Sequence, residues 1–363
     1  MSSRPIADMM VRVVTSALAS VGGRWASGLR DVTSDLSCLD TEGRWVVCVP
    51  YSGEAVCARF DRWSDSVDPS ELGRWGGPTP GQWESSLDER AYVRAVEATR
   101  SAIEAGSVYQ ANVCRVLTAS LPDPRTADVA ALHRLLSIGN PAPFGGFLRL
   151  PRQGVHVASA SPELFLGIAR AGDRRVVTSG PIKGTGRTAA DLSDKDVAEN
   201  VMIVDLMRND LSRICATGSV TVPGLLRLEH HPGLVHLVSD VEGELVPGAT
   251  WPGIIDATFP PGSVTGAPKL SALSLIDTLE PEARSYYCGA FGWVDADTRE
   301  AELAVAIRTF WLDGSAVKFG TGAGITWGSD PRGEWRETEL KAARLIDVAS
   351  GTWPPAADSA WQA

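Results

Sequence analysis

Hydrophobic and polar positions alternate along several stretches of this chain, which predicts strands. The clearest is Tyr109–Thr118, where one face carries Gln110, Asn112 and Cys114, an unusually polar set for a face turned toward a core. The other stretches expected to form strands are 44–49, 54–60, the region around 147, 155–160, 164–168 and 302–311. The Asp313-Gly314 turn after the last of them predicts a hairpin.

Apolar residues spaced three or four positions apart predict helices. A capping box of Ser86 and Glu89 starts the first helix, and Gly106 ends it. A second is expected from about 194 to 214, with Glu199 outside its buried stripe. That stripe consists of Val197, Val201, Val204 and Leu211. Further helices are expected at about 268–279 and 334–349, with a short one at the start of the chain.

Strands and helices are mixed without a regular βαβ order, so the predicted fold class is α+β with largely antiparallel sheets. Residues 1–85 would form a short N-terminal region packed on the main domain, ending in a loop rich in Gly, Pro, Ser and Trp. Residues 86–350 would form the main domain, and 351–363 a C-terminal tail.

Composition narrows the possible partners. The formal net charge of -10 argues against a nucleic-acid or acidic-membrane partner, which would need a basic face. The six cysteines show neither CxxC spacing nor a histidine at metal spacing, so zinc is not expected. No apolar run approaches the ~20 residues that span a bilayer, and the start lacks a secretory signal pattern. We therefore expect a cytoplasmic protein with reduced thiols.

Lys183 lies in a run of turn-forming residues, Pro181-Ile182-Lys183-Gly184-Thr185. A lysine on the floor of a pocket loses its charge readily, and the neutral amine is a nucleophile. A solvated surface charge is the alternative. Glu163, which follows a strand and precedes Leu164 and Phe165, could have a raised pKa and act as a general acid, or it could be an ordinary exposed carboxylate.

The last helix places Glu334, Glu337 and Lys341 on one stripe. Two carboxylates on one stripe repel each other unless a cation lies between them, and an oxygen-seeking ion such as Mg²⁺ would serve. Glu199 could supply a third carboxylate. A solvated face with a Glu337–Lys341 ion pair is the alternative.

The strand at 302–311 carries small residues beside Arg308, which leaves room for a ligand carboxylate. A structural ion pair is the alternative. The amides of the Gly322-Ala323-Gly324 turn could bind a second carboxylate. His236 alternates with apolar neighbours and fits a core residue as well as a site residue.

These motifs occur together in a known family. The matching segments are VYQANVCRV from Val108, ASPELFL from Ala160, PIKGT from Pro181, DVAENVMIVDLMRNDLSR from Asp196, FPPGSVTGAPK from Phe259, AVAIRTF from Ala304 and GAGITWGSDPRGEWRETELKA from Gly322. The chain thus resembles the chorismate-utilising enzymes over about residues 86–350, and within them component I of aminodeoxychorismate synthase. The resemblance implies two facing antiparallel sheets flanked by helices, with the site between the sheets.

The resemblance also implies roles for individual residues. Lys183 would attack ring carbon 2 of chorismate, and Glu163 would protonate the hydroxyl leaving carbon 4, where ammonia then enters and expels the lysine. The implied Mg²⁺ ligands are Glu199, Glu337 and Glu334. The implied substrate-binding residues are Arg308, Lys341, Gly322, Ala323, Gly324, Thr185, His236 and Gln110.

Two positions indicate which reaction of the family to expect. Isochorismate and salicylate synthases carry a lysine base where this chain has Gln110, and anthranilate synthases usually carry alanine where it has Lys183. Both residues favour 4-amino-4-deoxychorismate as the product, which would serve the synthesis of p-aminobenzoate and folate or of a secondary metabolite. Amination at carbon 2, giving anthranilate or 2-amino-2-deoxyisochorismate, and a catalytically silent regulatory relative are the alternatives. Ammonia is expected from a separate glutamine amidotransferase subunit, because no cysteine lies in a Gly-flanked nucleophile turn.

Overall fold

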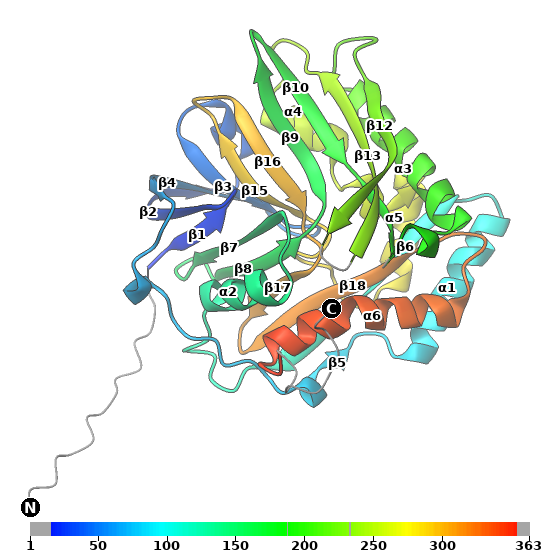
Figure 1. The fold of residues 1–363 in the computed structure, drawn as a ribbon, viewed down its shortest axis with the longest axis horizontal. Helices are drawn as coiled ribbons and strands as arrows, with labels where there is room; N and C mark the ends of the chain where they lie inside the picture. Colours follow the sequence, from blue (N-terminus) through cyan, green and yellow to red (C-terminus); the bar gives the residue numbers. More distant parts are fainter. Residues whose placement is uncertain (1–15, 187, 232–233, 354–363) are drawn as a thin grey trace, which may run out of the picture.

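The computed structural model describes residues 16–186, 188–231 and 234–353, and Figure 1 shows their arrangement. The short helix expected at the start falls partly in 1–15, outside the described residues, and the residues that follow form strands instead. The strands are β1 (Leu18–Val21), β2 (Arg24–Thr33), β3 (Arg44–Val49), β4 (Val56–Ser64), β5 (Glu84–Ser85), β6 (Gln110–Ser120), β7 (Phe144–Leu150), β8 (Val155–Ser161), β9 (Leu164–Ala171), β10 (Arg174–Gly180), β11 (Ile182–Gly186), β12 (Thr221–His231), β13 (Leu234–Glu244), β14 (Gly266–Ala267), β15 (Ala290–Asp295), β16 (Glu300–Val305), β17 (Thr309–Asp313) and β18 (Ala316–Ile325).

The helices pack around these strands. They are α1 (Glu89–Glu104), α2 (Val129–Gly139), α3 (Asp194–Ser212), α4 (Trp251–Thr258), α5 (Lys269–Leu279) and α6 (Pro331–Ala349), with short 3₁₀ turns that include η5 (Gly262–Val264). None of the helices in the described ranges is both long and apolar enough to cross a membrane.

The strands form one antiparallel hydrogen-bonded network that folds back on itself. One half runs β6–β18–β17–β8–β7–β1, and the other runs β2–β4–β3–β15–β16–β9–β10–β13, with β11 and β12 both on β13. The two halves meet where β1 pairs with β2. The predicted fold of two facing antiparallel sheets is therefore confirmed, with the halves continuous through this one pairing.

Side-chain alternation shows how the layers are stacked. Val157 on β8 packs in the same cluster as Val47 on β3 and Leu303 on β16, so this core lies between the two halves. Ala158, the next residue on β8, packs instead with Leu345 of α6 in a separate outer cluster. Helices α2 and α6 thus cover the outer face of the β7–β8–β17–β18 half, as Figure 1 shows.

Two local predictions were wrong, the extent of one strand and the cap of one helix. The strand expected at 302–311 is two strands, because the chain breaks at Ala306–Arg308, where Arg308 has a φ of 53°. Helix α1 is capped by Asp88, whose side chain accepts from the Ala91 amide, rather than by Ser86. The Ser86 hydroxyl accepts from the Val116 amide of β6 instead.

The buried stripe of α3 also differs from the prediction. Val197 and Val201 are 37% and 45% exposed, whereas Glu199 and Asn200 are buried. The buried face continues through Ile203, Val204, Met207 and Leu211. In the first turns of α3 the buried face lines a polar site rather than a hydrophobic core. The hydrophobic pattern therefore predicted the wrong face of α3 to be buried in these turns.

Candidate active site

Lys183 and Glu199 form the centre of the candidate site. Lys183 lies on β11 and Glu199 on α3, and the Nζ atom of Lys183 is 2.7 Å from Oε1 of Glu199. A second bond joins the same Nζ to the main-chain carbonyl of Ser263 at 3.0 Å. Both side chains are about nine-tenths buried, at 11% and 9% exposure. Lys183 is therefore not the exposed charge of the alternative interpretation.

The structure favours a charged Lys183, whereas the sequence analysis considers a neutral amine at this position. Burial alone would lower the pKa of Lys183, but the carboxylates of Glu199, Glu163 and Glu337 outweigh burial and raise it. In this arrangement the amine is held as an ammonium ion. Nucleophilic attack would therefore require the removal of a proton first.

Glu163 occupies the turn between β8 and β9 and is 4% exposed. Its carboxyl group lies near the Ser263 side chain, the Ile182 main chain and the charges of Lys183 and Lys341, all of which act to lower its pKa. Burial raises the pKa of Glu163 to about 7, even though these neighbours act in the opposite direction. A carboxyl group with this pKa can hold and release a proton near neutral pH, as a general acid must.

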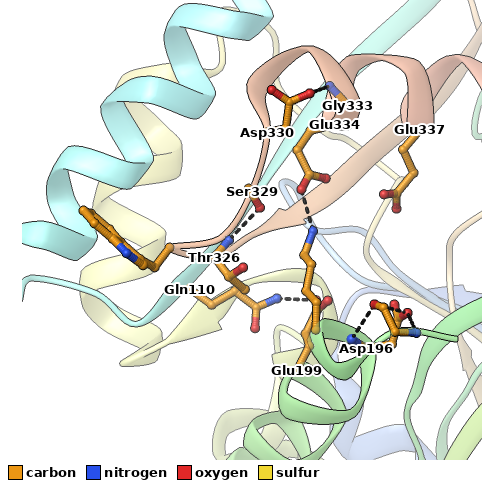
Figure 2. A network of polar contacts seen from close by, with 12 residues as sticks. Gln110, Asp196, Glu199, Thr326, Ser329, Asp330, Gly333, Glu334 and Glu337 are labelled. Carbon is orange, nitrogen blue, oxygen red and sulfur yellow. Dashed lines mark hydrogen bonds and ion pairs between the residues drawn. The ribbon is translucent and has the colours of Figure 1, made fainter.

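The outer part of the site lies where the starts of α3 and α6 approach each other. Figure 2 shows Glu334 and Glu337 pointing from α6 toward α3, with Glu199 beside Gln110 below them. Both helix starts are fixed by caps. Ser193 and Asp196 form a capping box on α3, and the Asp330 side chain accepts from the Gly333 amide on α6.

Each of the three predicted metal ligands is bound to a lysine. Besides the Lys183–Glu199 pair, Lys195 Nζ is 2.5 Å from Glu334 Oε1. Lys341 Nζ is 2.6 Å from Glu337 Oε1, which is the ion pair of the alternative interpretation. The lysines decide the charge of Glu337: burial would raise its pKa, but Lys341, Lys195 and Lys183 lower it.

The donor chemistry of this region suits a hard cation. Glu334 is 3% exposed, and its Oε2 atom is buried without a hydrogen-bond partner in the described part of the chain. Gln110 donates through Nε2 to Glu199 Oε1 at 2.5 Å, while its own Oε1 has no partner there either. These oxygens are the donors that Mg²⁺ prefers. In 16–186, 188–231 and 234–353, however, no three acidic, His or Cys side chains are grouped closely enough to hold an ion as they stand.

Arg308 is the other strongly charged group of the inner site. Its guanidinium makes no hydrogen bond or ion pair with any residue in the described ranges, although it is attracted by Glu163. Burial lowers the pKa of Arg308, and Glu163 opposes that effect. Its positive φ is a strained conformation for a residue other than glycine. A half-buried arginine with no such partner in the described ranges is suited to gripping a ligand carboxylate.

The predicted Gly322–Gly324 turn is part of β18, so its geometry is corrected. Gly322 pairs with Cys114 and Gly324 with Asn112 of β6. The Gly322 carbonyl accepts from Lys341 Nζ at 3.2 Å, so the polar atoms of Gly322 and, by alternation, of Gly324 point away from β6. The Ala323 amide points the other way. A Cβ on Gly324 would lie 2.3 Å from Glu199 Oε1, which explains why glycine is needed there.

His236 and Thr185 lie opposite each other on β13 and β11. His236 is 3% exposed, which fits a core residue as well as a site residue. The side chain of Thr185 lies outside the described atoms, so its predicted substrate contact stays a prediction.

Sequence reasoning missed two residues of the site. Ser263, in η5, contacts Glu163 through its side chain and Lys183 through its carbonyl. Lys195 binds Glu334 across the two helices. Lys195 precedes Glu199 by four residues, a spacing that puts both on one helix face and could have identified it. Nothing in the sequence pattern distinguishes Ser263.

The fold defines the class of protein: an α+β protein with two facing antiparallel sheets and a polar site of buried, oppositely charged groups. The family model for chorismate binding enzymes matches residues 33–347. The chain therefore belongs to the chorismate binding enzyme family.

Curated relatives carry more than one printed activity. The chain is 37% identical to anthranilate synthase component 1 of Thermus thermophilus over 295 residues, which are 75% of this chain and 62% of that protein. It is 40% identical to aminodeoxychorismate synthase of Streptomyces pristinaespiralis over 267 residues, which are 70% of this chain and 36% of that protein. The match thus spans less than two thirds of the length of either relative.

Solved structures confirm the fold. Anthranilate synthase component I of Streptococcus pneumoniae superposes with a TM-score of 0.72 at 23% identity, covering 95% of this chain and 93% of that one. The menaquinone-specific isochorismate synthase MenF of Escherichia coli gives a TM-score of 0.75 at 18% identity, covering 95% and 92%.

Proposed function

We propose that this protein aminates chorismate at ring carbon 4 to give 4-amino-4-deoxychorismate, with ammonia from a separate glutamine amidotransferase subunit. The observation that carries the proposal is the position of Lys183, which is buried beside a carboxyl group whose pKa is raised to about 7. A relative that lacks an amine at the position of Lys183 has no side chain there that could bond to ring carbon 2 of chorismate. The printed name of the Streptomyces relative supports the same reaction.

The proposed roles follow from the surroundings of each group. The Lys183 amine adds to carbon 2 after losing a proton to water. The ring double bonds shift, and the carbon-4 hydroxyl leaves as water with the proton of Glu163. Ammonia then adds at carbon 4, the double bonds shift back, and the lysine leaves carbon 2. Arg308 would hold a substrate carboxylate throughout, as would the Gly322 and Gly324 amides and Lys341.

Mg²⁺ is part of the proposal, with Glu199, Glu334 and Glu337 as its ligands. The bound ion would neutralise the ring carboxylate of chorismate. Lys183 and Lys195 would have to give up the carboxylate oxygens that they now hold. Glu337→Gln should therefore raise the Mg²⁺ concentration needed for half-maximal activity by about tenfold or more, equivalent to about 1.4 kcal/mol of binding free energy. Activity that is insensitive to both this substitution and chelators would remove the metal from the proposal.

Carbon-2 amination is the second candidate, because the Thermus relative is an anthranilate synthase component 1 by its printed name. The two reactions differ in their products. Purified protein would be incubated with chorismate, Mg²⁺ and ammonium, and the product identified by mass and ring-proton NMR. A 4-amino product supports the first proposal, whereas anthranilate or a 2-amino product contradicts it. Turnover with glutamine by this chain alone would contradict the separate amidotransferase.

A further inference from the structure

The polar face of β6 contains a residue without a role so far. Gln110, Asn112 and Cys114 share this face and are all buried. Gln110 binds Glu199 in the candidate site. Asn112, two residues further along, turns its side-chain amide toward the segment around η5.

Asn112 holds this segment through both its side chain and its main chain. Its Nδ2 atom donates to the carbonyls of Ser263 and Thr265 at 3.2 and 3.3 Å, and its main-chain amide donates to the same Thr265 carbonyl at 2.7 Å. The following strand β14 then pairs with β6, Gly266 lying opposite Ala111. The Asn112 side chain therefore joins Ser263 directly to β6.

Ser263 contacts both groups to which the proposed chemistry belongs. Its carbonyl accepts from Lys183 Nζ at 3.0 Å, and its side chain lies close enough to the Glu163 carboxyl group to lower the pKa of that group. The lysine side chain has a flexible four-carbon stem and cannot fix Ser263 by itself. We propose that Asn112 is a positioning residue of the reaction, holding Ser263 where it orients both Lys183 and Glu163.

A buried ion pair supports Asn112 from behind. Arg284, which is 2% exposed, donates to the Asn112 carbonyl at 3.0 Å and to the Val264 carbonyl at 2.8 Å. Glu280 binds the same guanidinium and accepts from the Cys114 amide at 2.8 Å. The main chains of β6 and η5 are thus joined to one buried ion pair. This arrangement leaves Asn112 little freedom to follow a displaced Ser263.

The test compares Asn112→Leu with Ser86→Ala. Leucine has the same branching at Cγ as asparagine but no polar atoms, and no carbonyl is orphaned, because Ser263 still accepts from Lys183 and Thr265 from the Asn112 main chain. Asn112→Ala is the second variant in case leucine does not fit. Ser86→Ala is the matched control, since it removes a hydrogen bond to the Val116 amide of the same strand without touching η5.

The inference rests on the proposed roles of Lys183 and Glu163, so activity is measured as chorismate consumption, whichever product forms. A displacement of reacting groups by about 1 Å can cost about a hundredfold in rate. We expect kcat of the folded Asn112 variants to fall about tenfold to a hundredfold, with KM for chorismate changed less than about twofold. The control should keep the kcat of the original protein.

The pH profile separates positioning from a general loss of stability. The Ser263 side chain lowers the pKa of Glu163, and the variants retain the charged groups around Glu163, which are Lys183, Lys341 and Arg308. The decline of kcat at high pH should therefore move to higher pH in the Asn112 variants. A kcat per folded molecule and a pH profile equal to those of Ser86→Ala would overturn the inference. A product aminated at carbon 2 by the unsubstituted protein would instead contradict the proposed function. The Asn112 variants could still be compared with Ser86→Ala, because chorismate consumption is measured whichever product forms.

Discussion

Glu163 at the inner end of the candidate site and Glu337 at its outer end carry the same carboxyl group in opposite surroundings. Glu163 is 4% exposed, and burial raises its pKa to about 7 despite the nearby lysines. The side chain of Glu337 is 45% exposed, and three lysines lower its pKa although burial acts the other way. Near neutral pH the inner group can donate a proton, whereas the outer group stays an anion.

The difference shows how one site can separate an acid from a cation ligand. Two carboxyl groups acquire distinct roles when their environments push their pKa values apart. At the inner end, the side chain of Arg308 has no hydrogen bond or ion pair within the described part of the chain. At the outer end, Glu334 and Glu337 each have a lysine partner. The inner end therefore suits chemistry on a substrate, and the outer end suits exchange of one cation for another.

The largest effect is expected from Lys183→Ala, which removes the proposed nucleophile at the inner end. Carbon-4 amination should fall by about a thousandfold or more, because the proposed covalent route then lacks its nucleophile. Intact-mass analysis after acid quenching should detect a chorismate-derived adduct on the original protein and none on the variant. Full activity with an unchanged product would remove Lys183 from the mechanism and make the inner end a binding site only.

Glu163→Gln should have the next largest effect, lowering kcat by about a hundredfold or more, the usual contribution of a general acid. The raised pKa sets the pH dependence. Glu163 holds its proton below about pH 7 and loses it above, so the activity of the original protein should decline as pH rises through about 7. The variant should lack this decline. A pH profile shared by both proteins would contradict the acid role.

Arg308→Gln should weaken substrate binding rather than the chemical step. A hydrogen bond to a charged group contributes about 1.5–3 kcal/mol, so KM for chorismate should rise by about tenfold to a hundredfold. Arg227→Gln is the control, because that arginine is exposed on β12 and pairs with Asp240 and Glu229. Equal KM values for the two variants would show that Arg308 grips no substrate.

Much of the strand pattern could be predicted from the sequence, and the failures have identifiable causes. The bounds predicted for β3, 44–49, agree with the structure, because that strand is buried and uninterrupted. The break before β17 depends on the positive φ of Arg308, which alternation does not encode. In α3, burial of Glu199 depends on partners in β6 and β11 that the helix pattern does not contain.

The site shows the same division. The sequence resemblance singled out Glu163, Lys183 and Arg308, and the structure brings the charges of Lys183 and Arg308 close enough to interact with that of Glu163. The Lys195–Glu334 contact joins residues 139 positions apart and follows only from the approach of α3 to α6. Lysine partners for the proposed metal ligands therefore could not be predicted from spacing, except for the pair four residues apart on α6.

The smallest effects are expected at the outer end, where removal of Lys195 and removal of Lys341 should lower the free energy of unfolding by different amounts. Lys195→Met would strip the only partner from Glu334, a 4% exposed side chain whose second oxygen already has none in the described chain. It should lower the free energy of unfolding by about 1–3 kcal/mol, the cost of an unsatisfied buried group. Lys341→Met breaks a pair whose side chains are 50% and 45% exposed and should cost less than about 0.5 kcal/mol.

Urea unfolding of both variants would measure the difference. Added Mg²⁺ should restore stability to Lys195→Met, because a cation then replaces the ammonium. Equal losses in the two variants would mean that the outer end is solvated throughout, and the contrast with the inner end would then be one of exposure alone.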